Sequence, residues 1–295
     1  MTDDDAATVH STRLLGSADR EAVLALLGRV ESHDGVAAVG EEGLLNLREP
    51  HRDVTHTLLR AGSAVAGYGW TDGSSGELAV DPAARRRGLG SALLESLLTA
   101  GPATAVWAHG TLPAALAFGE AHGLTVTRDL WQMRWEAVPV VVGELAEGYA
   151  ARAFTGPADG TDGTALVAAN ALAFANHPEQ GRFSVGDMRR RMQEPWWDPA
   201  LLRLVVREDS GELAGFCWVK PGEGTDEIYL VGVSAAHRGR GLAGWMVRDA
   251  QARAVEGGAS AMNLYVEGDN VSAIRAYHGT GFVQDARDVQ LAMVE

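Results

Sequence analysis

Hydrophobic and polar residues follow one another along this 295-residue chain in an order that occurs twice. Alternating runs predict strands, and apolar residues spaced three or four apart predict helices. The first series is strand 10–15, helices 19–30 and 42–48, a hairpin of 55–60 and 64–70, strand 77–80, helix 88–99, strand 104–108, helix 113–122 and strand 132–135. The second series is strand 149–154, helices 164–175 and 185–193, a hairpin of 201–207 and 213–220, strand 227–233, helix 241–256, strand 261–266, helix 271–278 and strand 289–294. Hairpins followed by strand–helix units predict an α/β fold with a mixed sheet.

The repeated order of elements predicts two similar domains. A chain of 295 residues has room for two domains that each bury a core. The connection between them is expected around 140–148. We therefore expect one domain over residues 1–140 and a second over residues 146–295.

The most informative stretch is Glu227 to Gly244, EIYLVGVSAAHRGRGLAG. Its apolar first part predicts a buried strand, its polar middle a loop rich in arginine and glycine, and its last part the start of a helix. Such a loop presents backbone N–H groups and the positive end of a helix dipole. The arrangement predicts a site for phosphate.

Two phosphate-binding motifs compete for this loop. Gly239, Gly241 and Gly244 spell G-x-G-x-x-G, a dinucleotide motif that is weak alone and expects its glycines directly after the strand. The alternative is R-x-x-G-x-G/A, beginning at Arg238. The first half contains a second copy, ELAVDPAARRRGLGSALL from Glu77, which keeps R-x-x-G-x-G but has Ser91 in place of the third glycine. The recurrence favours the second motif.

R-x-x-G-x-G/A resembles the loop that holds the pyrophosphate of coenzyme A in Gcn5-related N-acetyltransferases. The run GDNVSAIRAYHGTGF also resembles this family, with Asn270 and Tyr277 at the places of its N…A-x-x-x-Y-x-x-x-G-F pattern. The resemblance implies two tandem GNAT domains, and a tyrosine hydroxyl that protonates the leaving thiolate. A core aromatic is the alternative for Tyr277.

The two copies differ at this second motif. In the first, GTLPAALAFGEAHGL, the tyrosine place holds Gly119, or Phe118 after a slip of one residue, and the asparagine place holds Leu112. Neither Gly119 nor Phe118 has an acidic proton. We therefore expect the C-terminal copy to be catalytic and the N-terminal copy to be structural, although the latter keeps a loop for coenzyme A.

Acetyl transfer to an amine requires loss of a proton, because an ammonium has no lone pair. At pH 7 this costs ~1.4 kcal/mol for an α-amine with a pKa of about 8, and ~4.6 kcal/mol for a lysine amine. A carboxylate acting directly or through water suffices for an α-amine. Glu227, where the central strand begins, is the candidate base, with a solvated strand-end charge as the alternative. In this fold a backbone N–H near Val233 would bind the oxyanion.

Composition and charge limit the classes of molecule that the protein is expected to bind and the compartment in which it is expected to work. The net charge of −14 argues against general nucleic-acid binding, so the basic run Arg85–Arg87 in an acidic chain favours a local anion site. The longest apolar runs are too short to span a bilayer, and the acidic N-terminus has no secretory pattern. Cys217 is the only cysteine, which suits a reducing cytoplasm, and its apolar surroundings predict a buried inert thiol. We expect a cytoplasmic monomer that acts on small molecules and binds no metal.

Along its whole length the chain resembles the mycothiol synthase family of actinobacteria. The segments that carry this resemblance are SHDGVAAVGE (32–41), NHPEQGRF (176–183), AGFCWVK (214–220), EIYLVGV (227–233), RGRGLAG (238–244) and LYVEGDNVSAIRAYHGTGF (264–282). It implies acetylation, by acetyl-CoA, of the cysteinyl α-amine in a cysteine–glucosamine–inositol conjugate. A composition rich in arginine, with Lys220 as its sole lysine, is compatible with a GC-rich actinobacterial genome.

The resemblance also implies contact residues. Those for the acceptor are Asp34, Glu179, Lys220, Glu227 and Tyr265. Those for acetyl-CoA are Val231, Gly232, Val233, Arg238, Gly239, Arg240, Gly241, Leu242, Ala243, Gly244, Asn270, Val271, Ser272, Ala273, Ile274 and Arg275. A second acetyl-CoA would contact Leu78, Ala79, Val80, Arg85, Arg86, Arg87, Gly88, Leu89 and Gly90.

The chain departs from the family where Cys217 and Val219 replace polar residues, and where Ala243 ends the loop motif. Two other functions are open: a tandem acetyltransferase for another amine, such as an aminosugar or a peptide N-terminus, and a non-enzymatic acetyl-CoA sensor. Asn270 and Tyr277 argue against a sensor, since a binder has no use for a leaving-group acid.

Overall fold

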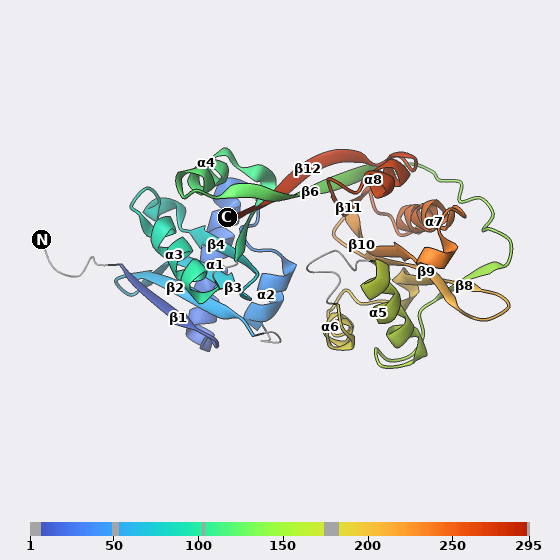
Figure 1. The fold of residues 1–295 in the computed structure, drawn as a ribbon, viewed down its shortest axis with the longest axis horizontal. Coiled ribbons are helices and arrows are strands. Elements are labelled where there is room, and N and C mark those ends of the chain that lie inside the picture. The colour runs from blue at the N-terminus through green and yellow to red at the C-terminus, as the bar shows by residue number, and fades with distance from the viewer. Residues whose placement is uncertain (1–6, 49–52, 102–103, 174–182, 294–295) are drawn as a thin grey trace, which may run out of the picture. The chain divides into compact units, whose positions relative to one another are not determined.

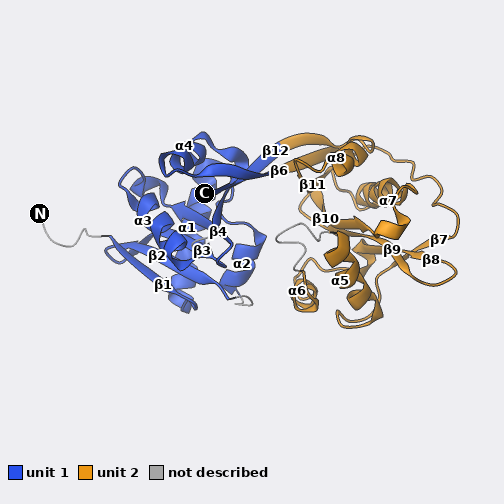
Figure 2. Ribbon diagram, viewed as in Figure 1, with its two compact units in different colours: residues 1–130, 286–295 blue, residues 131–285 orange. Residues whose placement is uncertain are grey.

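The computed structural model describes residues 7–48, 53–101, 104–173 and 183–293. It divides into two compact units (Figure 2): unit 1 consists of residues 1–130 and 286–295, and unit 2 of residues 131–285. These units differ from the two continuous ranges expected from the sequence, because the last ten residues belong to unit 1. The reason lies in two long strands, β6 (Thr125–Glu136) and β12 (Val283–Ala292), each of which contributes residues to both units.

Unit 1 has helices on both faces of a sheet whose strand order is β1-β2-β3-β4-β5-β12. Helices α1 and α2 pack with β2, β3 and β4 in one core cluster, and α3 and α4 contribute to the clusters on the other face. Its elements are β1 (Thr8–Thr12), α1 (Ser17–Asp34), α2 (Glu41–Arg48), β2 (Thr55–Ala61), β3 (Ala64–Thr71), β4 (Ser75–Val80), the 3-10 helix η2 (Pro82–Ala84), α3 (Leu89–Ala100), β5 (Ala105–Ala108), η3 (His109–Thr111) and α4 (Pro113–Ala121).

Unit 2 repeats this plan with the order β7-β8-β9-β10-β11-β6. Figure 1 shows α5 and α6 on one face of β9 and β10, with α7 on the other. Its elements are β7 (Tyr149–Ala153), α5 (Thr161–Ala173), α6 (Val185–Arg191), η5 (Pro199–Leu201), β8 (Leu202–Arg207), β9 (Leu213–Lys220), β10 (Thr225–Val233), η6 (Ala235–His237), α7 (Leu242–Glu256), β11 (Ala261–Glu267) and α8 (Val271–His278).

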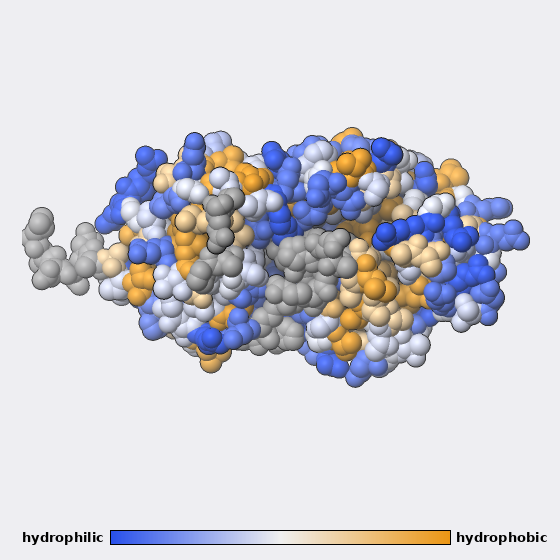
Figure 3. Space-filling view, viewed as in Figure 1, coloured by the Kyte–Doolittle hydropathy of each residue, from blue (hydrophilic) through white to orange (hydrophobic). Residues whose placement is uncertain are grey.

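The sheet is mixed, as predicted. β9 and β10 pair antiparallel, whereas β10 and β11 pair parallel, and β4 stands in the same relation to β3 and β5. The predicted hairpins and helices are present in both halves. The strands predicted at 132–135 and 289–294 are longer than expected, because β6 begins at Thr125 and β12 at Val283. Figure 3 shows hydrophilic residues over much of the viewed face of each unit.

Candidate functional site

The two arginine-rich loops have the same backbone conformation. Arg238 (φ −65°, ψ 159°) and Arg85 (φ −66°, ψ 165°) are extended, and each follows a 3-10 helix. Gly241 (φ 75°, ψ 3°) and Gly88 (φ 81°, ψ −2°) are left-handed at the N-caps of α7 and α3. The loops therefore match residue by residue, as the repeated motif predicts.

Each loop leads into a helix N-terminus that fits a pyrophosphate. The first helical backbone bond of α7 runs from Trp245 N–H to the Gly241 carbonyl at 3.0 Å, and that of α3 from Ala92 to Gly88 at 3.2 Å. The N–H groups of the residues between are the ones that a helix leaves for another acceptor. A Cβ atom on Gly88 or Gly241 would meet nothing within 4 Å, so the surface beside these N–H groups is open.

One position distinguishes the loops. Gly239 (φ 75°) corresponds to Arg86 (φ 63°), a left-handed conformation that is unfavourable for a residue with a side chain. The loop of unit 1 thus has a left-handed backbone at Arg86, the conformation that glycine adopts at Gly239 in unit 2.

In each unit the strand that leads into the arginine-rich loop pairs with its parallel neighbour only over its first residues. Beyond them the two strands separate. β10 pairs with β11 from Thr225 to Ile228, and the register pairs stop there although β10 continues to Val233. Ser234 donates its N–H to Ala214 of β9, and N–H directions alternate along a strand. The N–H groups of Val231 and Val233 consequently face the gap between β10 and β11.

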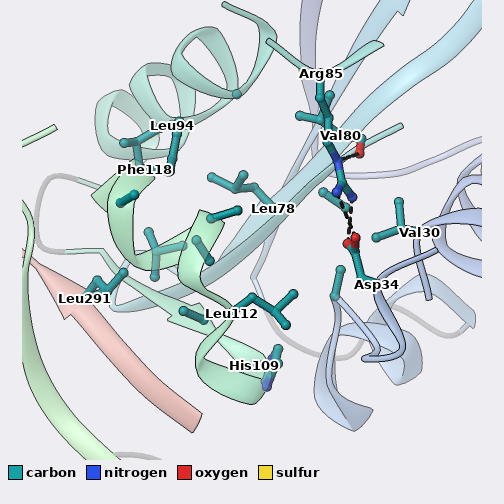
Figure 4. Close-up of a pocket in the computed structure, with 18 of the residues that line it drawn as sticks. Val30, Asp34, Leu78, Val80, Arg85, Leu94, His109, Leu112, Phe118 and Leu291 are labelled. Atoms are coloured by element: carbon teal, nitrogen blue, oxygen red, sulfur yellow. Dashed lines mark hydrogen bonds and ion pairs between the residues drawn. The ribbon is translucent and has the colours of Figure 1, made fainter. Parts of the chain in front are cut away.

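In unit 1 the corresponding gap opens into a cavity of about 630 Å³ (Figure 4), a size usual for small-molecule sites. β4 and β5 pair only at Ser75 and Gly76 before they part. Leu78 and Val80 line the cavity, together with Leu112, Phe118 and loop residues 85–86 and 88–91. Its wall is mostly apolar with the arginine loop at one end, as a pantetheine arm and pyrophosphate require.

Asp34 lies at this arginine loop. Its two carboxylate oxygens accept hydrogen bonds from the Arg85 guanidinium at 2.8 and 2.7 Å (Figure 4), and this pairing lowers the pKa of Asp34. Arg85 also donates its Nε–H to the Val80 carbonyl at 3.1 Å. The carboxylate expected to contact the acceptor thus has an ion-pair partner inside unit 1.

Tyr277 is buried on the α7 side of unit 2. It is 9% exposed, its ring packs edge-on against Phe282, and Cys217 belongs to the same core cluster. Burial raises the pKa of the Tyr277 hydroxyl well above its usual value, so the hydroxyl keeps its proton at neutral pH.

Gly119, the counterpart of Tyr277, has no room for a side chain. A Cβ atom there would lie 2.7 Å from the Leu291 side chain of β12. Leu112, the counterpart of Asn270, provides no side-chain cap for α4. Unit 1 therefore lacks the tyrosine and also the space for it.

Glu227 lies beside Lys220 across the β9–β10 ladder, so both side chains project from the same face. Lys220 Nζ lies over the Trp196 and Tyr229 rings, which belong to the face covered by α5 and α6. Glu227 is thus on the α5–α6 face, whereas Tyr277 is on the α7 face. The candidate base and the candidate acid thus lie on opposite faces of the sheet.

A β-bulge is a further difference between the two units: β10 of unit 2 has one, and the matching strand β4 of unit 1 does not. The β9–β10 register shifts between Ile228 and Leu230, leaving Tyr229 as an extra residue, while the β3–β4 register has no such shift. Counting through the parallel pairs, Ser75 takes the place of Glu227 in unit 1. Unit 1 therefore has neither the bulge nor the carboxylate.

The other predicted residues lie as follows. Asn270 accepts a hydrogen bond from Ala273 N–H at 3.2 Å and caps α8, whose first turns hold Val271–Arg275. Tyr265 on β11 is 43% exposed. Cys217 and Val219 are buried in the core beneath α7, so the thiol is enclosed as predicted and neither residue lies on the Lys220 face. Glu179 lies outside the described residues.

A partly buried charge network at the unit 1 cavity was missed from the sequence. His109 lines the cavity, and its Nε2 and Nδ1 lie 2.8 Å from Glu77 and 3.0 Å from Asp288. Glu77 also accepts hydrogen bonds from Trp70 Nε1 at 2.6 Å and from Gly40 N–H at 2.9 Å. Burial would lower the pKa of His109, but the hydrogen bonds to Asp288 and Glu77 outweigh it and raise the pKa to about 10. His109 is consequently a fixed cation and cannot serve as a base at neutral pH.

Two negative findings concern the described residues alone. No group of three or more histidine, cysteine or acidic side chains within them is arranged to hold a metal ion. No helix in the same ranges combines the length and apolar composition needed to cross a bilayer.

Comparison with known proteins agrees with the geometry. The model of the acetyltransferase (GNAT) family matches residues 171–282. A protein of Kineococcus radiotolerans named mycothiol acetyltransferase is 42% identical, covering 92% of both chains, and one of Sanguibacter keddieii with the same name is 39% identical, covering 95% of both. A solved tandem GNAT protein from the clavulanic acid biosynthesis pathway superposes with a TM-score of 0.70 at 19% identity, covering 96% of this chain and 98% of that one.

Proposed function

Since the chain belongs to the mycothiol acetyltransferase family of GNAT enzymes, we propose that it acetylates the cysteinyl amine of a cysteine–glucosamine–inositol conjugate with acetyl-CoA, giving mycothiol. The observation that carries the proposal is that these relatives, at 42% and 39% identity, cover almost the whole chain. The asymmetry of the duplicated site is consistent with it, because unit 2 alone has the bulge, Glu227 and Tyr277.

Acetyl-CoA binds unit 2 through the loop Arg238–Gly244 and the N-terminus of α7. The left-handed Gly239 and Gly241 leave the loop N–H groups open to the pyrophosphate. The pantetheine arm lies in the gap between β10 and β11, beside Val231–Val233 and residues Asn270–Arg275. Bound there, acetyl-CoA supplies a thioester carbonyl as the acetyl donor.

Glu227 takes the proton from the acceptor ammonium, directly or through water, on the α5–α6 face. The free amine attacks the thioester carbonyl, and the N–H of Val231 or Val233 stabilises the oxyanion. The attacking nitrogen loses its second proton to water, and the tetrahedral intermediate collapses with cleavage of the C–S bond while the new C–N bond remains. Tyr277, protonated because burial raises its pKa, donates its proton to the departing sulfur from the α7 face. Water then returns a proton to the Tyr277 oxygen.

Within unit 2 the acceptor is held by Lys220, Glu227 and Tyr265. Glu179 and Asp34 are contacts that the family resemblance alone implies. Lys220 and Glu227 are supported as contacts of one ligand because they lie opposite each other across the β9–β10 ladder. For Asp34 the support is the family resemblance, and its present partner is Arg85.

Unit 1 binds a second acetyl-CoA without turning it over. Its cavity, its loop from Arg85 to Gly90 and the open N-terminus of α3 support binding. Gly119 and Ser75, in place of the acid and the base, support the absence of chemistry. The catalytic copy is thus the C-terminal one, and we place the protein as a monomer in the reducing cytoplasm, in keeping with its single buried thiol.

The proposal is tested by following loss of the acetyl-CoA thioester through its ultraviolet absorbance when the purified protein and acetyl-CoA are mixed with different amines, because the cysteinyl acceptor has a thiol of its own that would react with a thiol reagent. The cysteinyl conjugate is expected to give the highest kcat/KM. An aminoglycoside or a peptide N-terminus that exceeded it would replace the acceptor. Tight acetyl-CoA binding with no turnover of any amine would make the protein a sensor instead.

A further inference from the structure

Four aromatic side chains gather on the α5–α6 face of unit 2, next to Lys220 and Glu227. Trp218 is fully buried, and its ring centroid lies 5.7 Å from Trp196, 5.2 Å from Trp197 and 5.4 Å from Tyr229. Trp196 and Tyr229 also contact each other, with centroids 5.5 Å apart. Both are only partly buried, so they form the outer layer of the cluster.

The β-bulge puts Tyr229 into this cluster. A bulge places an additional residue in one strand and re-aims its side chain. Tyr229 and its neighbour Leu230 both pack in the core cluster of the α5–α6 face, whereas Ile228 belongs to the α7 side. In unit 1, β4 has no bulge, so no residue corresponds to Tyr229. The aromatic surface is therefore specific to the unit that carries Glu227 and Tyr277.

Lys220 is held against the same two rings. Its Nζ lies 5.3 Å from the Trp196 centroid and 5.6 Å from the Tyr229 centroid, within the range of cation–π attraction. Its cross-strand partner is Glu227. The candidate base, a cation and two aromatic rings thus share one small region of the sheet.

The Tyr229 ring is also held in place by a residue of α6. Arg191 of α6 is buried, donates its Nε–H to the Tyr229 hydroxyl, and has its guanidinium carbon 5.8 Å from the Tyr229 ring centroid. The Trp218 Nε1–H, in contrast, has no acceptor among the described residues. A buried donor without an acceptor is unfavourable.

We propose that Trp196 and Tyr229 form a stacking surface for the sugar ring of the acceptor, with Lys220 donating hydrogen bonds to its hydroxyl groups. A pyranose presents C–H groups on its ring face, which pack on aromatic rings, and hydroxyl groups around its edge, which suit a cation. The cysteinyl amine attached to that sugar would then lie near Glu227. This inference rests on the proposed function and assigns the carbohydrate specificity to Trp196.

The first test compares two acceptors that share the cysteinyl amine: the glucosamine–inositol conjugate and cysteine methyl ester, which has no sugar. For Trp196→Ala we expect kcat/KM for the conjugate to fall about tenfold, mainly through KM, while kcat/KM for the methyl ester is unchanged. Trp196→Phe keeps an aromatic face and should restore most of the loss. An equal fall for both acceptors, or no fall for the conjugate, would overturn the stacking role.

Trp197→Phe is the matched control, because Trp197 packs on Trp218 and Phe154 within the same cluster. It should leave the ratio of the two kcat/KM values unchanged, and a collapse of that ratio would mean that general packing, not Trp196, sets selectivity. Failure of the wild-type protein to acetylate the conjugate would count against the proposed function itself. The acceptor ratio in the Trp196 variants tests the stacking surface separately.

A second test uses the fact that Lys220 is the only lysine. Reductive methylation followed by peptide mass spectrometry therefore reports on a single side chain besides the N-terminus. With coenzyme A present, a saturating concentration of the N-acetylated conjugate, which has no free amine to react with formaldehyde, should slow modification of Lys220 about fivefold or more, whereas N-acetylcysteine methyl ester should not. If the conjugate left the rate unchanged, Lys220 would not contact the sugar.

Discussion

Tyr277 has the hydroxyl on which the proposed leaving-group step depends. Burial raises the pKa of this hydroxyl, so in the resting protein at neutral pH it holds the proton that the step requires. Tyr277→Phe should lower kcat about 10²-fold and change acetyl-CoA affinity less than twofold, because the ring packing is kept. Steady-state kinetics and calorimetry measure the two quantities. Tyr68→Phe, at a buried tyrosine of unit 1, serves as the control, and an unchanged kcat in Tyr277→Phe would remove the acid role.

The contribution of Glu227 to kcat/KM is expected to be larger at pH 7 than at pH 9. The acceptor amine has a pKa of about 8, so above that value it loses its proton without help. Glu227→Gln should reduce kcat/KM about 10²-fold at pH 7 and clearly less at pH 9. Asp226→Asn, one residue away, is the control for a change of charge. A loss that is the same at both pH values would indicate a role in binding instead of proton transfer.

At the residue scale, sequence motifs predicted the loop positions and Tyr277 but not their surroundings. Cys217 could be assigned to the core because its strand is apolar throughout. The contacts of His109 with Glu77 and Asp288 could not be predicted, because only long-range strand pairing brings these residues together. Trp196 belongs to no motif, and the bulge at Tyr229 is invisible until the ladder register is known.

The duplicated strand–loop–helix element allows a paired experiment. Gly241 and Gly88 have the same left-handed conformation and the same free space around them. Alanine at either position should strain the loop by ~1 kcal/mol through φ alone, because no atom would clash with the added methyl group.

Gly241→Ala should raise the KM for acetyl-CoA several-fold, whereas Gly88→Ala should leave the kinetics of the reaction nearly unchanged. The expected difference follows from placing turnover in unit 2. Initial rates over a range of acetyl-CoA concentrations measure it for both variants. The assignment of the catalytic copy would be reversed if Gly88→Ala alone impaired turnover.

Element types were predictable where apolar residues recur at helical spacing, as in α3 and α8, and where turn residues separate two apolar runs, as in the hairpins. β6 and β12 were predicted too short. The first part of β6 is exposed, Thr125–Thr127, and β12 begins with exposed Val283–Asp285, so neither shows the buried alternation by which a strand is recognised. What makes them strands is pairing with distant segments, β12 with β5 among them.

At the scale of the molecule, the network of His109 links the C-terminal strand to the cavity of unit 1. The pKa of His109 is raised to about 10 against about 6.5 for an unperturbed imidazole. Such a group stabilises the fold fully below pH 6.5, and this stabilisation declines as the pH rises and is lost above pH 10. Stability should therefore decrease in that window.

Asp288→Asn should lower the Tm at pH 7 and flatten its decline between pH 7 and pH 10, because one of the two carboxylates that hold the imidazolium is gone. Thermal unfolding at several pH values measures both effects. Asp285→Asn, three residues earlier on the same strand, provides the control. A decline as steep in Asp288→Asn as in the wild type would show that His109 does not govern it.

The contribution of residues 286–295 to unit 1 has a consequence for how the protein is made. Domains of a nascent chain generally fold in the order of their synthesis, the N-terminal one first. Here β5 pairs with β12, and Val289 and Leu291 complete a buried cluster. The half that the ribosome translates first must therefore wait for β12 before its sheet can close, and a chain that stopped before Val289 would leave that half unfinished.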